Sequence, residues 1–210
     1  MSVDLRNKPL NKKICKENLF LLKEMFDKNS ISFRLGYGTL LGAVRDNDFI
    51  TWDNDIDLLF DKEDKPKVMD CLPELFKLGF VERGLRENFW RINRKGERID
   101  IYFFSQTNIL DKLRDLVVCK YGAFCVYIDK FYWDDSTTIK FLEKDFLVFK
   151  EYEQWLTKCY GADWRVPQVK KGRAKTFFSH YLMYFLKWGK RRVPYEFGEK
   201  VLAFYRKLVK

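Results

Sequence analysis

Residues 36–60 read GYGTLLGAVRDNDFITWDNDIDLLF, and this stretch decides the fold. Its first four residues include two glycines, which predicts a tight turn, and the apolar run at residues 40–44 predicts a short helix after it. From residue 52 to residue 60 acidic and apolar side chains alternate, which is typical of a strand with one buried face. The stretch therefore combines helix and strand within 25 residues.

The segments on either side add further helices and strands. Apolar side chains recur with helical spacing at residues 10–29 and with strand-like spacing around Asp100. We therefore expect an α+β fold with a mixed sheet and flanking helices. Helices are expected at residues 10–29, 62–78, 109–118 and 150–160, strands at residues 32–35, 80–83, 89–93, 98–104 and 123–128, and a hairpin turn within residues 93–97.

The composition is that of a folded protein and gives no sign of a membrane span. Hydrophobic residues make up 47% and charged residues 33% of the 210 residues, so the chain can bury a core. The longest apolar-rich stretch, residues 177–188, is shorter than the roughly 20 residues that a spanning helix needs. Residues 1–13 contain no apolar signal core, and we therefore expect a cytoplasmic protein.

Cysteine and histidine offer little chemistry here. The five cysteines are scattered without a CxxC pair, so neither a disulfide framework nor a zinc knuckle is expected. His180 is the only histidine, which excludes a multi-histidine metal site. Catalysis would therefore depend on carboxylates, hydroxyls and basic groups.

The net charge of +10 lies in the C-terminal segment. Residues 170–210 hold 12 basic and two acidic residues, which leaves 28 of each in residues 1–169. We predict a catalytic domain at residues 1–169 and a basic, aromatic, helical extension at residues 170–210, with helices at residues 176–187 and 197–208. Such a pair of helices suits the surface of an anionic membrane, and the alternative is that its apolar side packs on the catalytic domain.

Three aspartates form the candidate catalytic centre. Asp55 and Asp57 are two residues apart on a predicted strand, so they share a face at about 6.6 Å along the backbone. Asp100 on another strand would complete an acidic site for a hard cation, Mg²⁺ or Mn²⁺. Asp100 is either a third metal ligand or a general base that deprotonates the attacking hydroxyl.

The turn before the aspartates is a candidate phosphate site. Backbone N–H groups and a hydroxyl at Gly38 and Thr39 lie at the expected start of a helix, where anions bind favourably. Arg45 follows at the end of the same helix and is expected to reach the same phosphates. A glycine turn, an arginine and an Asp-x-Asp strand within about 20 residues together indicate metal-assisted chemistry on a phosphate.

These motifs resemble the signature of the LicD family. The similarity lies in residues 37–45 (YGTLLGAVR) and 49–57 (FITWDNDID), and extends to residues 98–101 (RIDI) and 156–167 (LTKCYGADWRVP). The family includes bacterial phosphorylcholine transferases and the eukaryotic fukutin-related phosphoribitol transferases. The resemblance implies a nucleotidyltransferase-like fold.

The resemblance also implies a reaction. A LicD-type enzyme moves a phosphocholine-, phosphoribitol- or phosphoglycerol-like group from a CDP-activated donor to a hydroxyl of a cell-surface glycan or its lipid-linked precursor, as in lipopolysaccharide or teichoic acid biosynthesis. Asp55, Asp57 and Asp100 would hold the metal, and Gly38, Thr39 and Arg45 would hold the donor's phosphates. Such a protein would work in the cytoplasm, peripheral to the inner face of the membrane.

The sequence departs from the family pattern at two positions. Thr51 stands where the family more often has proline, and Asn54 stands where it more often has aspartate, so Asn54 cannot be an anionic ligand. Asp53 either touches the metal or only orients Arg45. Relatives with a cysteine and histidine zinc module have no equivalent here, and no zinc is expected.

Two other functions compete with this one. A nucleotidyltransferase that attaches NMP to an acceptor would use the same fold and the same acids. A non-catalytic module would use the basic extension to bind membrane or nucleic acid, although intact Asp55, Asp57 and Arg45 argue against lost catalysis. We expect no specific nucleic-acid partner, because residues 1–169 carry no net charge.

Overall fold

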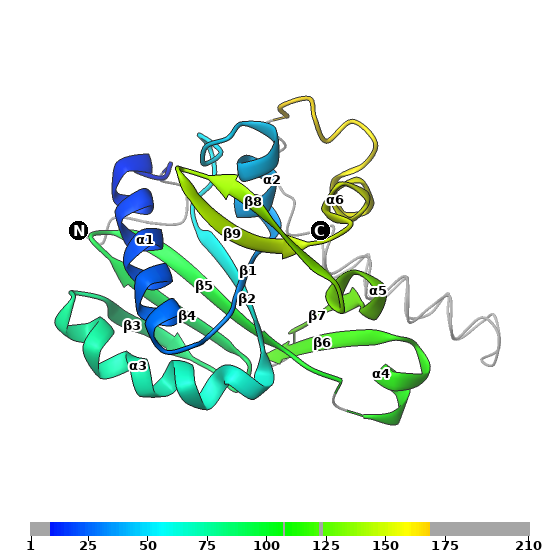
Figure 1. Cartoon of the computed structure of the whole chain (residues 1–210), viewed down its shortest axis with the longest axis horizontal. Coiled ribbons are helices and arrows are strands. Elements are labelled where there is room, and N and C mark those ends of the chain that lie inside the picture. The colour runs from blue at the N-terminus through cyan, green and yellow to red at the C-terminus, as the bar shows by residue number, and fades with distance from the viewer. Residues whose placement is uncertain (1–8, 107, 122–123, 169–210) are drawn as a thin grey trace, which may run out of the picture. The chain divides into compact units, whose positions relative to one another are not determined.

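The computed structural model describes residues 9–106, 108–121 and 124–168 of the chain (Figure 1). The helices expected at residues 176–187 and 197–208 lie outside these residues. The domain boundary at residues 169 and 170 stays a prediction. Among the described residues, no helix combines the length and the apolar character needed to cross a bilayer.

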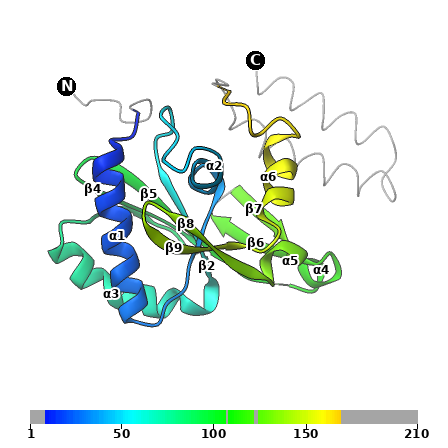
Figure 2. The same ribbon diagram turned by 45° about the horizontal axis from the view of Figure 1, so that its top comes forward.

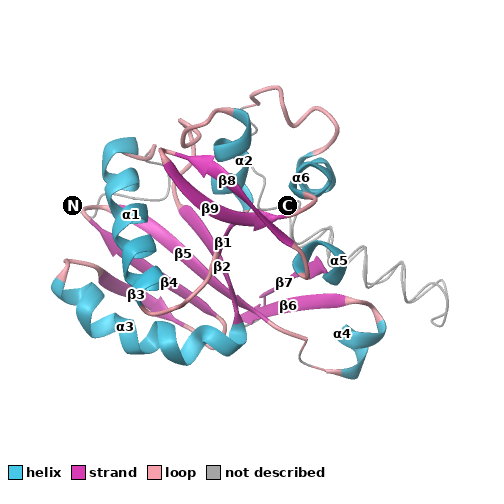
Figure 3. Cartoon of the chain, in the orientation of Figure 1, coloured by secondary structure: helices cyan, strands magenta, loops and turns pink. Residues whose placement is uncertain are grey.

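A seven-stranded mixed sheet forms the centre of the fold, with the strand order β3-β4-β5-β2-β1-β9-β8 (Figure 3). The β2–β5 and β1–β9 pairs are parallel, and the other four pairs of this sheet are antiparallel. A separate pair, β6 and β7, is antiparallel. The strands are β1 Arg34–Leu35, β2 Ile56–Asp61, β3 Val81–Leu85, β4 Phe89–Arg94, β5 Glu97–Phe104, β6 Leu116–Tyr121, β7 Phe124–Asp129, β8 Ser136–Phe141 and β9 Lys144–Phe149.

Two groups of helices flank the sheet. The helices are α1 Lys12–Lys28, α2 Tyr37–Arg45, α3 Lys65–Lys77, α4 Ile109–Leu113, α5 Lys130–Trp133 and α6 Tyr152–Tyr160, with a 3₁₀ turn at Lys62–Asp64. Helix α1 packs beside α3, whereas α2 packs between β2 and α6. The two groups stand apart in both views (Figures 1 and 2). This arrangement confirms the α+β fold with a mixed sheet and flanking helices.

Aromatic rings fill much of the core under α1. Phe26 of α1 meets Phe60 of β2 edge to face at 5.2 Å between ring centroids, and Phe33 at 5.8 Å. Phe60 in turn contacts Phe103 of β5 at 5.7 Å. Each such pair adds about 0.5–1.5 kcal/mol beyond the area that it buries. Because residues 56–60 of β2 are all buried, this strand lies in the interior of the fold.

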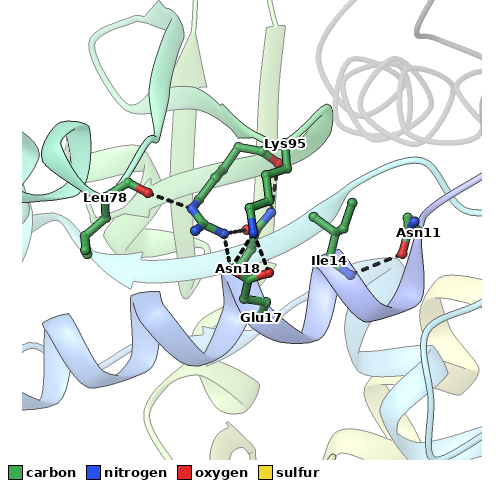
Figure 4. Close-up of polar contacts among 7 residues, drawn as sticks. Asn11, Ile14, Glu17, Asn18, Leu78 and Lys95 are labelled. Carbon is green, nitrogen blue, oxygen red and sulfur yellow. Dashed lines mark hydrogen bonds and ion pairs between the residues drawn. The ribbon is translucent and has the colours of Figure 1, made fainter.

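Helix α1 is fastened to the β4–β5 hairpin by polar contacts (Figure 4). Asn11 caps the helix, because its Oδ1 accepts a hydrogen bond from the Ile14 N–H at 3.2 Å. Arg94 donates to Glu17 at 2.8 Å and to Asn18 Oδ1 at 2.9 Å, and its Nε donates to the Leu78 carbonyl at 2.8 Å. One arginine thus joins α1, the end of α3 and the hairpin.

The start of the β2 strand differs from its prediction. The alternation from residue 52 predicts a strand there, but β2 begins only at Ile56. The backbone of Asp53 is used elsewhere, since its N–H donates to the Ile50 carbonyl and its carbonyl accepts from the Leu10 N–H. These bonds turn the chain, so Asp53 and Asp55 lie in the loop before the strand.

Two other boundaries also differ. Residues 36–39 do not form a separate turn, because α2 begins at Tyr37 after an extended Gly36. The expected helix at residues 109–118 is wrong beyond Leu113, where α4 ends. Asp115 takes a positive φ of 51°, which breaks the helix, and strand β6 follows.

The β8–β9 hairpin was not predicted from the sequence, and the backbone of its turn explains why. Its two turn residues, Leu142 and Glu143, both have positive φ, at 50° and 78°. Such a turn favours Gly, Asn or Asp, and a Leu-Glu pair gives no turn signal. The β4–β5 hairpin was predictable because Gly96 occupies one of its two positive-φ positions.

Candidate active site

The strand register builds the candidate site on three neighbouring strands. On the parallel strands β2 and β5, Asp57 lies directly opposite Asp100. On the antiparallel strands β4 and β5, Arg91 lies directly opposite Asp100. Arg98 is two residues before Asp100 and therefore shares its face of the sheet. The three strands thus bring two aspartates and two arginines onto one face.

The structure brings Asp55, Asp57 and Asp100 together. One carboxylate oxygen from each lies within 4.8 Å of the others. Asp57 is 6% and Asp100 2% exposed, whereas Asp55 is half-buried. Three convergent carboxylate oxygens suit a hard divalent cation such as Mg²⁺ or Mn²⁺, which prefers oxygen ligands. The residues present therefore fit the metal that the sequence predicts.

Burial and mutual repulsion make this cluster electrostatically costly. Burial raises the pKa of Asp57 well above its ordinary value, and the charges of Asp55, Asp53 and Asp100 raise it further. Burial, followed by the charge of Asp55, raises the pKa of Asp53 to about 7. Burial also raises the pKa of Asp100, against the hydrogen bonds from Arg91. A bound cation would offset this repulsion.

Two arginines complete the site. Arg91 donates two hydrogen bonds to Asp100, at 2.8 and 2.7 Å, which fixes that carboxylate in place. Arg98 donates to Asp55 and, at 2.9 Å, to Asn54 Oδ1. Neither arginine was predicted as a site residue. Strand alternation around Asp100 was a signal for Arg98, whereas finding Arg91 requires the register of the β4–β5 hairpin.

The start of α2 lies against the acidic loop. The Thr39 hydroxyl oxygen accepts a hydrogen bond from the Asp57 N–H at 2.9 Å, which links α2 to β2. A methyl group at Gly38 would lie 2.1 Å from Asp53 Oδ2, so a larger residue there would force the Asp53 carboxylate to move. Gly38 and Thr39 are thus beside the carboxylates, in the first turn of a helix.

Replacing Gly38 with alanine should disturb the site and the fold together. The new methyl group would displace Asp53, whose carboxylate also accepts from the Asn54 N–H at 3.0 Å. We expect a loss of about 1–3 kcal/mol in the free energy of unfolding, as for overpacking in a core, measured by urea denaturation. Gly84→Ala is the matched control, because nothing lies within 4 Å of its added methyl group. Equal stability of the two variants would contradict this packing.

Arg45 at the end of α2 pairs with Asp46. It ends α2, six residues beyond Thr39 and so about 9 Å further along the helix axis. Its guanidinium donates two hydrogen bonds to Asp46, both at 2.7 Å, and lies near the Trp52 ring. Asp53 lies close to Gly38. The predicted phosphate contact of Arg45 stays a prediction.

Aromatic side chains border the carboxylates. Tyr102 shares the face of Asp100, two residues further along β5. Its ring lies 5.4 Å from that of Tyr37, and Phe89 stacks on Tyr121 at 4.6 Å. Burial, followed by the nearby charges of Asp57 and Asp100, raises the pKa of Tyr102 well above its ordinary value. The acids therefore face a largely buried wall of rings.

Comparisons with known proteins concern the family and the fold. The family model described as "LicD/FKTN/FKRP, nucleotidyltransferase domain" matches residues 30–167. The lipopolysaccharide cholinephosphotransferase LicD of Haemophilus influenzae is 35% identical over 57 residues, which is 27% of this chain and 22% of that protein. An uncharacterized protein of Rickettsia prowazekii is 39% identical over 58 residues, or 28% of this chain and 22% of that protein. The match thus spans about a fifth of each relative's length.

A solved structure shares the fold at low identity. The solution structure of the antibiotic-resistance factor ANT(2″)-Ia superposes with a TM-score of 0.50 and 13% sequence identity, covering 94% of each chain. This likeness concerns the fold alone.

Proposed function

Because the chain belongs to the LicD/FKTN/FKRP family of nucleotidyltransferase domains, we propose that it is a metal-dependent transferase of phospho-alcohol groups. The donor is a CDP-activated alcohol, and the acceptor is a hydroxyl of a cell-surface glycan or its lipid-linked precursor. Phosphocholine is the first candidate for the transferred group, since a relative is named a cholinephosphotransferase. Phosphoribitol and phosphoglycerol groups are the alternatives.

The convergence of Asp55, Asp57 and Asp100 within 4.8 Å carries this proposal. These carboxylates would hold Mg²⁺ or Mn²⁺. When bound, the cation would neutralise charge on the donor's phosphates and so favour displacement at phosphorus. Transfer to a hydroxyl would form a phosphate ester bond and break the bond between the transferred phosphorus and the bridging oxygen of the donor's pyrophosphate. CMP would leave with the electrons of that bond, and the proton of the hydroxyl would pass to solvent.

Neighbouring residues keep the carboxylates in position. Thr39 ties the backbone of Asp57 to α2, and Arg91 holds both oxygens of Asp100. The same two hydrogen bonds fix the Asp100 carboxylate where one of its oxygens converges with those of Asp55 and Asp57. We therefore propose that Asp100 acts as a metal ligand rather than as the base.

The start of α2 is the proposed site for the donor's phosphates. The first N–H groups of a helix have no acceptor within the helix, and the helix dipole favours an anion there. Gly38 and Thr39 lie in this first turn, beside Asp57. The Thr39 hydroxyl accepts from the Asp57 N–H and retains its own proton for donation.

Product analysis tests the proposal against its closest rival. We expect the protein to release CMP from one of CDP-choline, CDP-ribitol or CDP-glycerol when an acceptor glycan and Mg²⁺ are present. A nucleotidyltransferase would instead release pyrophosphate from CTP. Cation binding at the aspartates without turnover of any donor would favour the non-catalytic module.

The basic extension supports a further proposal, that the protein works on the inner face of a membrane. Residues 170–210 carry 12 basic residues, and each basic group near an anionic surface contributes about 1 kcal/mol. We expect the full chain to float with anionic liposomes, less so at high salt. The variant Lys190→Gln/Arg191→Gln/Arg192→Gln should float less. Equal flotation of the variant, or none by the full chain, would contradict this contact.

A further inference from the structure

Arg98 occupies the space between two of the proposed metal ligands. Its Nη2 contacts Asp55 Oδ2 and donates to Asn54 Oδ1 at 2.9 Å, and its Nε lies 3.7 Å from Asp100 Oδ1. The side chain is 22% exposed. The guanidinium therefore supplies positive charge to the same carboxylates that would bind a divalent cation.

The guanidinium of Arg98 uses fewer of its nitrogens in hydrogen bonds than that of Arg34, a structural arginine of this fold. Arg34 uses all three guanidinium nitrogens, donating to Ser136 Oγ at 2.9 Å, to Asp61 Oδ2 at 3.2 Å and to the Trp133 carbonyl at 3.2 Å. The Nε of Arg98 is buried and has no hydrogen-bond partner among the described residues. Charge, rather than a full set of hydrogen bonds, holds Arg98 in this position.

Arg91 makes a different contact with the cluster. It is 38% exposed, and it approaches Asp100 from the neighbouring strand β4 through both carboxylate oxygens. It can keep this pair while the other lone pairs of Asp100 bind a cation. Arg98, in contrast, contacts Asp55 and lies beside Asp100 at once.

We propose that Arg98 is a resident counter-ion of the carboxylate cluster, which a divalent cation must displace in order to bind. This inference rests on the metal site of the proposed function. A guanidinium and a metal ion repel each other and compete for the same carboxylate oxygens. Arg98 therefore stabilises the metal-free site and lowers its affinity for the cation.

The test is a calorimetric titration of the full chain with Mn²⁺ alone. We expect Arg98→Gln to bind Mn²⁺ about tenfold more tightly than the parent protein or better, which is the scale of one lost hydrogen bond to a charged group. Arg34→Gln is the matched control, because it removes the same charge near Asp61, four residues along β2 from Asp57, and should leave the affinity unchanged. Circular dichroism verifies that each variant is folded.

The sign of the change separates this role from a structural one. If Arg98 only held Asp55 in place, its loss would weaken Mn²⁺ binding, and equal or weaker binding would overturn the inference. If Asp55→Asn weakens Mn²⁺ binding neither in the parent protein nor in the Arg98→Gln variant, the proposed metal site itself would be overturned. The two failures are therefore distinguishable.

A spectroscopic measurement covers the case in which Arg98→Gln does not fold. In the parent protein, the arginine Nε–H signals can be followed by NMR while Mg²⁺ is added. We expect the chemical shift of the Arg98 signal to change as Mg²⁺ binds the carboxylates that Arg98 contacts, whereas the chemical shift of Arg34 does not change. An Arg98 signal that does not respond to saturating Mg²⁺ would overturn the inference.

Discussion

Replacing Asp57 with asparagine should abolish transfer without harming the fold. Asp57 is 6% exposed and faces the charges of Asp55, Asp53 and Asp100, so its carboxylate is costly in the metal-free protein. The amide removes that charge at nearly the same shape. We therefore expect a melting temperature at or above that of the parent protein when no metal is present.

The same change should cost about a thousandfold or more in the rate of transfer. A bound cation contributes several kcal/mol to the stabilisation of transition-state charge, and each 1.4 kcal/mol is about a factor of ten. An amide in place of the central carboxylate removes most of that binding. The rate is measured as CMP released from the accepted donor, and Mn²⁺ affinity is measured on the same sample.

Asp61 provides the matched control on the same strand. It pairs with Arg34 and accepts a hydrogen bond from Trp133 Nε1 at 2.7 Å, away from the carboxylate cluster. Asp61→Asn should lower the melting temperature and leave the rate per folded molecule unchanged. A fully active Asp57→Asn variant, or an inactive but well-folded Asp61→Asn variant, would contradict this assignment.

Replacing Asp100 with asparagine should reduce the rate by about 100-fold or more. This carboxylate is 2% exposed and accepts two hydrogen bonds from Arg91, which fix its orientation beside Asp57. As a metal ligand it should lose Mn²⁺ affinity together with rate. The comparison of calorimetric affinity with the rate of CMP release therefore distinguishes its two possible roles.

Mn²⁺ affinity and the rate of CMP release in Asp100→Asn give a different combination for each role of Asp100. Loss of rate with unchanged Mn²⁺ affinity would make Asp100 the base, and retention of most of the rate would make it structural. Arg91→Lys is the companion variant, because lysine keeps the charge but loses the two-pronged contact. It should show a smaller loss than Asp100→Asn.

Local signals predicted much of the fold. Helical spacing located α1, and Gly96 with flanking alternation located the β4–β5 hairpin. Signals of this kind depend on neighbours in the sequence. The β8–β9 hairpin lacks them, since its turn is Leu142-Glu143, and its place beside β1 depends on a parallel pairing of Arg34 with Leu147. Such distant pairing is decided by the tertiary fold.

The residues of the candidate site likewise include some that local sequence signals predict and others that only the tertiary fold places there. Asp55 and Asp57 were predictable because their spacing is local, and Asp100 because its strand alternates. Arg91 was not, because the register that places it opposite Asp100 is set across strands, whereas alternation along β5 places Arg98 on the face of Asp100 without showing that it reaches Asp55. The phosphate contact expected of Arg45 stays a prediction, since its guanidinium pairs with Asp46 in this structure.

A crystal of the full chain soaked in Mn²⁺ tests the proposed metal centre most directly. The anomalous difference map is expected to show a peak within about 2.0–2.6 Å of oxygen atoms from Asp55, Asp57 and Asp100, with Arg98 withdrawn from Asp55. A fully occupied Mn²⁺ site elsewhere, with Arg98 still bound between these carboxylates, would contradict it.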